Sequence, residues 1–166
     1  MKKLTLTEAI APATEMLMKG RALLTVGGET PNTMTIGWGF IGYSWNKPVF
    51  CVVVRKQRYT HDLLLTEGNF TVSMSMDENL KPVFAFAGTE SGRDVNKFSG
   101  HGMTMEKAQK VTAPIVKECT LHFECVTRLV QEMTEDRMDK EMSARVYPMK
   151  DFHTMVFGEI VDIYET

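Results

Sequence analysis

Three short apolar runs follow one another in the segment 22–60, separated only by turn residues, and this spacing strongly limits the possible folds. They are predicted as strands over residues 22–26, 34–41 and 48–54. Turn residues separate them at Gly27-Gly28, Pro31-Asn32 and Asn46-Lys47-Pro48. Consecutive parallel strands need a crossover of roughly a dozen residues or more, whereas antiparallel strands can be joined by a tight turn. The segment therefore predicts an antiparallel sheet.

The rest of the chain adds further strand patterns and short helical ones. Strands are predicted over residues 70–76, 119–130 and 154–164, and helices over residues 7–19, 59–67 and 79–87. Thr7 is the expected N-cap of the first helix. About six strands with a few short helices favour an antiparallel barrel over a doubly wound sheet. No Gly-x-Gly-x-x-Gly follows a strand, and the absence of repeats or linkers predicts a single domain over residues 1–166.

Charge and composition argue against several classes of partner. The formal net charge of −2 provides no field that would attract DNA or RNA. No apolar run approaches the roughly 20 residues that a membrane span requires. Glu8, Pro12 and Glu15 interrupt the apolar region that a signal peptide needs, so the N-terminus is interpreted as part of the mature protein. The three cysteines lie in apolar runs, which predicts reduced, buried thiols and a cytoplasmic protein.

Two polar clusters lie at the ends of the predicted strands. The first, Asn32 to Trp38, includes Gly37, so backbone donors and acceptors could approach the pyrimidine edge of an isoalloxazine ring. The second, Arg55 to Thr60, combines cationic and hydroxyl side chains before a predicted helix, as phosphate binding requires. An ordinary turn and strand, and a solvated basic turn, remain the structural alternatives.

Two further segments offer binding groups. The loop 91–98 carries Arg93 and Lys97 as possible anion contacts and Phe98 as a possible cover for an aromatic ring. A plain surface loop is the alternative for this segment. His153 stands at the start of the last predicted strand, where a lone histidine more often has a structural role.

Taken together, these segments resemble the flavin reductase-like family, the FMN-binding split barrels that include flavoredoxins and the small reductase components of two-component monooxygenases. The resemblance covers about residues 20–130 and 150–164. Its most specific motif is the loop 91–98, which is close to the family's Ser-Gly-Arg-Asp-x-x-Lys-Phe. The family's Asn-x-Met-Thr stands at residues 32–35, and its Gly-x-Phe-x-Val-Asn strand at residues 68–73, with Ser73 in place of the last Asn.

The segment 131–149 departs from the shorter reductase members of the family. It is highly charged and has no strand pattern, so a solvated hairpin tip, a short helix and a mobile flap all remain open. His153 precedes Gly158 by five residues, as the histidine of the final Asp-His strand does in the reductase members, although Phe152 separates it from Asp151. This likeness implies a position on the nicotinamide side of the site.

The resemblance implies a mainly β, Greek-key split barrel that forms a homodimer, with FMN bound near the dimer interface. The implied cofactor-binding residues are Asn32, Thr33, Met34, Thr35, Gly37, Trp38, Arg55, Arg58, Tyr59, Thr60, Arg93, Lys97 and Phe98. Residues 32–38 would line the isoalloxazine, while Arg55, Arg58 and Thr60 would hold the phosphate. The loop 91–98 would close over the cofactor.

The implied activity is hydride transfer from NADH or NADPH to FMN, in which the cofactor carries the chemistry. One alternative is a flavoredoxin-type carrier that exchanges electrons with a redox partner protein and has no nicotinamide site of its own. Another is a flavin- or heme-binding module without enzymatic activity. Turnover of NADH or NADPH by the purified protein separates the first interpretation from the other two.

Overall fold

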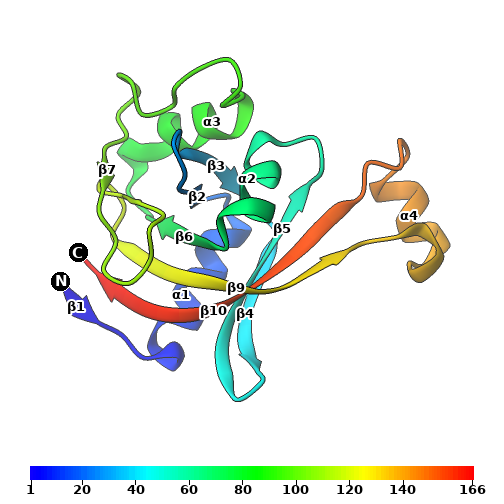
Figure 1. Ribbon diagram of the computed structural model, residues 1–166, viewed down its shortest axis with the longest axis horizontal. Coiled ribbons are helices and arrows are strands. Elements are labelled where there is room, and N and C mark those ends of the chain that lie inside the picture. The colour runs from blue at the N-terminus through cyan, green and yellow to red at the C-terminus, as the bar shows by residue number, and fades with distance from the viewer.

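A computed structural model describes all of residues 1–166 and shows a mainly antiparallel β protein with four α-helices (Figure 1). The strands of the main sheet are β1 (Lys2–Lys3), β2 (Ala22–Val26), β3 (Asn32–Ile36), β4 (Gly39–Ser44), β5 (Lys47–Arg55), β6 (Asn69–Met74), β9 (Leu121–Glu132) and β10 (His153–Glu165). The short strands β7 (Met105–Glu106) and β8 (Ile115–Val116) form a separate pair. The helices are α1 (Leu6–Met18), α2 (Tyr59–Glu67), α3 (Lys81–Thr89) and α4 (Lys140–Val146).

The main sheet runs in the order β3-β2-β6-β9-β10-β5-β4, with β1 paired to β10. Every pair is antiparallel, which confirms the expected sheet. Its two end strands, β3 and β4, follow one another in the chain but are not paired with each other. The sheet is thus not closed by hydrogen bonds, and a barrel is not confirmed.

The principal core lies between the sheet and α1. It contains 22 buried apolar residues, among them Phe50, Phe70 and Phe123 of the sheet. Helix α1 contributes Ala9, Ala13 and Leu17, which are spaced four residues apart and so share one helix face. A smaller cluster packs α3 and the loop that follows it against Leu23. None of the helices is long and apolar enough to cross a membrane.

The N-cap of helix α1 lies two residues before the position that the sequence predicts. Thr5, not Thr7, is the N-cap, because its hydroxyl accepts from the backbone N–H of Glu8. The Glu8 carboxylate in turn accepts from the backbone N–H of Thr5 at 2.7 Å, completing a capping box. The backbone N–H and the hydroxyl of Thr5 both donate to the Glu8 carboxylate and lower its pKa.

The predicted strand over residues 34–41 is interrupted, and this break is important for the site. Gly37 and Trp38 belong to neither strand: β3 ends before them, and β4 begins after them on the opposite edge of the sheet. The β4–β5 turn is also displaced from its predicted position. It is formed by Trp45 and Asn46 with φ of 53° and 57°, the left-handed pair that a two-residue hairpin favours.

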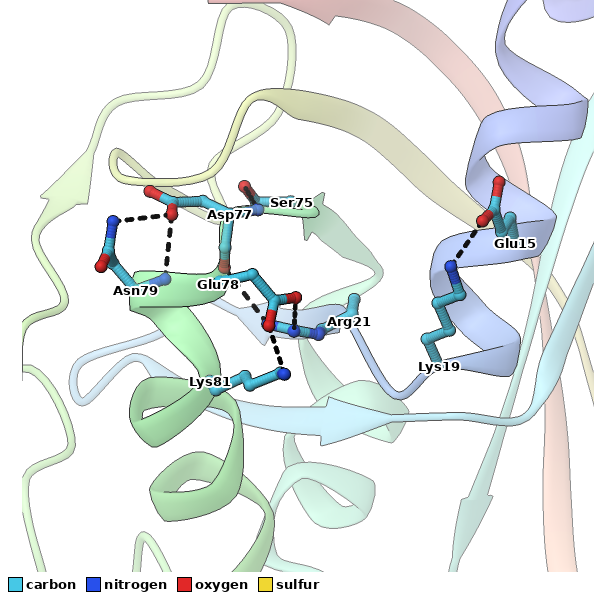
Figure 2. Close-up of polar contacts among 8 residues, drawn as sticks. All are labelled: Glu15, Lys19, Arg21, Ser75, Asp77, Glu78, Asn79 and Lys81. Carbon is cyan, nitrogen blue, oxygen red and sulfur yellow. Dashed lines mark hydrogen bonds and ion pairs between the residues drawn. The ribbon is translucent and has the colours of Figure 1, made fainter.

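A polar cluster fixes the start of α3 to the sheet (Figure 2). Arg21 is buried and donates to the Glu78 carboxylate at 2.7 Å and to the Asp77 carbonyl at 3.2 Å. Glu78 also pairs with Lys81 in the first turn of α3. The Arg21 guanidinium lies 5.5 Å from the ring centre of Phe84, one turn further along α3.

The segment 131–149 forms the end of a long hairpin arm. Strand β9 continues to Glu132, and a 3-10 turn over Glu135–Arg137 and helix α4 follow before β10 returns. Figure 1 shows β9 and β10 extending together from the body of the molecule, with α4 at their far end. Two of the interpretations of this segment, a hairpin tip and a short helix, therefore both apply.

Candidate functional site

Two adjoining cavities form one groove beside β3 and the start of α2. The first, about 280 Å³, is lined by Asn32, Met34, Gln57, Arg58, Tyr59, Thr60, Ala87, Glu90, Ser91, Gly92 and Lys97. The second, about 200 Å³, is lined by Met34, Thr35, Ile36, Gly37, Trp38, Val53, Val54, Arg55, Arg58 and His153. Met34 and Arg58 line both. The groove thus has a polar end, in the first cavity, and a ring end, where Trp38 and His153 lie.

Hydrogen-bond donors from separate segments converge at the polar end. Asn32 of β3 donates its side-chain N–H to the Thr60 hydroxyl at 2.8 Å, which ties β3 to α2. Lys97 is buried and donates to the Ala87 carbonyl at 2.8 Å, leaving two of its ammonium hydrogens. Arg58 reaches the Gly88 carbonyl at 3.4 Å. The side chains are therefore already directed into one small volume.

Burial and charge both act on Lys97. Desolvation and, to a smaller extent, the neighbouring Arg58 guanidinium together lower its pKa to about 8, while Glu90 acts in the opposite direction. Burial and the nearby Arg58 make the charged form of Lys97 unfavourable, and a bound anion would offset this cost. The polar end is therefore suited to a negatively charged ligand.

The N-terminus of α2 adds to this positive character. Arg58 is the N-cap residue, and no side chain caps the first turn. The unsatisfied N–H groups of a helix N-terminus carry a partial positive charge and bind anions. The hydroxyl of Thr60, in that first turn, lies in the same cavity.

Gly92 allows the loop 91–98 to approach this end. A Cβ at position 92 would lie 2.1 Å from the Asn32 Oδ1 and 2.9 Å from the Tyr59 Cδ1. No residue with a side chain fits there without displacing Asn32 or the loop. The requirement at this position is therefore space, not an unusual backbone conformation.

The ring end combines aromatic and cationic groups. Trp38 and His153 have ring centres 4.7 Å apart, and Trp38 is 49% exposed. Arg55 lies opposite His153 in the β5–β10 pairing and forms an ion pair with Asp151. Burial lowers the pKa of His153 to about 4, and Arg55 and Arg58 contribute to the shift. His153 is thus neutral near pH 7.

The structure brings most of the sequence-predicted residues to the groove but separates them into two groups. Asn32, Met34, Arg58, Tyr59, Thr60 and Lys97 line the polar end, and Thr35, Gly37, Trp38, Arg55 and His153 line the ring end together with Met34 and Arg58. Arg55 is therefore not beside Thr60, contrary to its expected place in a common phosphate cluster. Its neighbours are Asp151 and His153 because β5 pairs with β10.

Three predicted residues do not line the groove. The side chain of Thr33 points to the opposite face of β3 from Asn32 and Met34. Its hydroxyl donates to the Leu24 carbonyl within the sheet. Arg93 lies outside, paired with Asp62 at 2.6 Å and stacked over Tyr59. Phe98 packs on the cluster of α3 and Met103, so it does not cover the groove.

The sequence interpretation missed Tyr147 and Glu90. Glu90 follows α3 and lines the polar end. Tyr147 follows α4, and its hydroxyl lies 2.8 Å from Nδ1 of His153. It is the single aromatic residue of the segment 131–149, which is the one signal that could have singled it out.

Comparison with known proteins identifies the family. A model of the flavin reductase like domain matches residues 16–166. The chain belongs to the flavin reductase-like family. A protein of Archaeoglobus fulgidus is 34% identical over 151 residues, which cover 90% of this chain and 74% of that protein. A Pyrococcus abyssi protein is 27% identical over 150 residues, covering 88% and 74%.

Solved structures of other proteins share the fold. Flavoredoxin from Methanosarcina acetivorans matches with a TM-score of 0.70 and 25% identity, over 89% of this chain and 68% of that one. The NADH:FAD oxidoreductase SgcE6 from Streptomyces globisporus C-1027 matches with a TM-score of 0.69 and 20% identity, over 89% and 75%. The second likeness shows the fold alone.

Proposed function

We propose that this chain binds FMN in the groove and acts as an NAD(P)H-dependent flavin oxidoreductase. The observation that carries the proposal is the convergence of Asn32, Arg58, Thr60 and Lys97 in one cavity. Membership of the flavin reductase-like family supports it. An FMN-binding protein from Thermus thermophilus with the same fold, at 24% identity and a TM-score of 0.68, is consistent with it.

The donor set fits the phosphate of FMN. Arg58, Lys97 and the Thr60 hydroxyl offer charged and neutral donors, and the uncapped N-terminus of α2 offers backbone N–H groups. Glu90 is the single acidic residue among those lining this cavity, and it lies near enough to Lys97 to influence its pKa. The net charge of the lining side chains favours an anion.

The ring end of the groove fits the flavin ring and the nicotinamide that reduces it. When bound, FMN supplies the hydride-accepting chemistry, and the protein contributes binding, orientation and exclusion of water. Met34, Gly37 and Trp38 would line the flavin ring. His153, neutral and beside Trp38, would face the nicotinamide that donates the hydride.

A flavoredoxin-type electron carrier is the second candidate. It is favoured by the likeness to the flavoredoxin of Methanosarcina acetivorans, at 25% identity. Under this alternative the chain binds FMN in the same groove and receives electrons from a partner protein. Purified protein that holds FMN but does not consume NADH or NADPH would support this candidate over the first.

Comparison of FMN with riboflavin tests the binding site. We expect Arg58→Ala to weaken FMN about tenfold or more, because a charge-assisted hydrogen bond is worth about 1.5–3 kcal/mol. Riboflavin, which lacks the phosphate, should bind almost as before. Arg137→Ala is the matched control, since Arg137 is exposed in the arm and lines neither cavity. If Arg58→Ala weakens the binding of FMN and riboflavin equally, the phosphate does not bind at the polar end of the groove.

A further inference from the structure

Tyr147 connects the tip of the β9–β10 arm to the ring end of the groove. It is 4% exposed, and its hydroxyl lies 2.8 Å from Nδ1 of His153. The two residues lie at opposite ends of the short connection between α4 and β10. The contact therefore couples the segment 131–149 to a residue of the candidate site.

Several contacts hold the Tyr147 ring in place. Its backbone N–H donates to the Ser143 carbonyl at 2.8 Å, which makes it the C-cap of α4. Its ring centre lies 4.8 Å from that of Phe152 and 5.6 Å from the Arg55 guanidinium. The position of the hydroxyl is thus determined by α4 and by the start of β10.

The partners of this hydroxyl determine which nitrogen of His153 carries the proton. Burial raises the pKa of Tyr147, so the phenol keeps its single proton near pH 7. Its two possible acceptors are Nδ1 of His153 and the Met133 sulfur at 3.5 Å. A thioether is a weak acceptor, whereas a neutral imidazole nitrogen is a good one. The phenol therefore donates to Nδ1, and the ring proton lies on Nε2.

The groups around His153 are consistent with a neutral ring. Arg55, paired with Asp151, comes from β5, and Arg58 comes from the turn before α2. Burial, followed by the two guanidiniums, disfavours a positive charge on the imidazole and so lowers its pKa. A neutral ring whose Nδ1 is occupied has a single donor left, the Nε2–H.

We propose that Tyr147 is a positioning residue that fixes His153 as the Nε2–H tautomer, so that the ring presents a hydrogen-bond donor at the ring end of the groove. This inference rests on the proposed function for its ligand, the carboxamide oxygen of a reduced nicotinamide. An amide carbonyl needs a donor, and the opposite tautomer would offer it a lone pair. A residue of the arm thus determines which nitrogen of His153 is the hydrogen-bond donor in the site.

Nitrogen-15 NMR of histidine-labelled holoprotein tests the tautomer without any nicotinamide. We expect His153, assigned by loss of its signals in His153→Gln, to carry its proton on Nε2. In Tyr147→Phe, which keeps the ring contacts, the preference should be lost and both tautomers should appear. Tyr43→Phe is the control, because Tyr43 is 69% exposed on β4. An unchanged tautomer in Tyr147→Phe would overturn the proposal.

A double-variant cycle tests the consequence for the substrate. Tyr147→Phe should raise KM for the nicotinamide about fivefold with little change in kcat, which corresponds to one neutral hydrogen bond in binding. His153→Gln places an amide donor near Nε2 without needing Tyr147. In that background Tyr147→Phe should have almost no further effect. The same fivefold rise in both backgrounds would contradict positioning through His153.

The two experiments separate the two hypotheses. A protein that oxidises neither NADH nor NADPH would refute the proposed reductase activity, while the NMR result would still decide the role of Tyr147. Conversely, active enzyme with an unchanged tautomer in Tyr147→Phe would refute only the positioning role.

Discussion

At the scale of single residues, Gly92 is a point where the groove does not tolerate added atoms. A Cβ there would overlap the Asn32 side chain, which is buried and hydrogen-bonded to the Thr60 hydroxyl. We expect Gly92→Ala to lower FMN affinity about five- to tenfold, because the loop must retreat or the Asn32–Thr60 bond must break. Fluorescence titration with FMN measures this loss. Gly42→Ala is the control, since no atom lies within 4 Å of its added Cβ. Unaltered affinity in a folded Gly92→Ala would argue against close packing of the loop in solution.

Lys97 should make FMN binding depend on pH. Its pKa is lowered to about 8, and only the protonated ammonium attracts a phosphate. Loss of that proton as pH rises therefore weakens FMN, and a group with this pKa predicts about tenfold weaker binding at pH 9 than at pH 7. Riboflavin should show no such loss, and Lys97→Met should bind FMN weakly but with a flatter pH profile. If wild-type protein binds FMN with as little pH dependence as it binds riboflavin, Lys97 does not contact the phosphate.

At the scale of elements, the cluster around Arg21 should hold α3, and with it one wall of the groove, against the sheet. Arg21→Ala removes hydrogen bonds of a buried guanidinium to Glu78 and Asp77 (Figure 2). We expect a loss of about 2 kcal/mol in the free energy of unfolding, measured by urea denaturation. Lys19→Ala, which breaks the exposed pair with Glu15, should cost less than about 0.5 kcal/mol. Equal effects of the two substitutions would show that burial of Arg21 adds nothing.

The sequence predicts those elements whose signals are local. Strand β2 and helix α2 have their predicted bounds, because an apolar run between turns and a helix before Gly68 are both defined by neighbouring residues. The break after Ile36 is not local. It reflects β4 pairing with β5 at the far edge of the sheet, a choice made by long-range contacts.

The site divides in the same way. The motif of the loop 91–98 predicts a binding role, and Gly92 and Lys97 of this loop line the groove. Phe98, in the same motif, packs into the α3 cluster because an apolar ring next to an apolar surface gains most by burial. Tyr147 has no motif, and only the fold of the arm brings it to His153. Residues that act through tertiary contacts therefore remained outside the prediction.

At the scale of the whole molecule, an apolar row crosses four strands beside the groove. The register pairs Phe40 with Cys51, Cys51 with Phe157, and Phe157 with Leu129. Cross-strand neighbours lie on the same face of a sheet, and Trp45 joins them, with its ring centre 6.1 Å from that of Phe157. Phe40 is 50% exposed and Trp45 56% exposed. Monomeric proteins rarely leave such a surface open to water.

We propose that a second copy of this chain covers the row, so that the protein is a homodimer with its flavin near the interface. Trp38, at the ring end of the groove, precedes β4 by one residue and is also half exposed, so the row and the groove are continuous. A ligand that bridges two chains stabilises their association. Dilution of the holoprotein should therefore release FMN as the dimer dissociates, which sedimentation read at the flavin absorbance detects directly.

Phe40→Glu should shift the protein to a monomer and weaken FMN together, because a charge placed in an apolar interface has no partner. Met149→Glu is the control, since Met149 is exposed in the connection between α4 and β10 and is not part of the row. If wild-type protein sediments as a monomer that keeps its FMN at nanomolar concentration, a single chain completes the site. If Phe40→Glu dissociates the dimer but leaves FMN affinity intact, the interface exists but contributes nothing to the flavin.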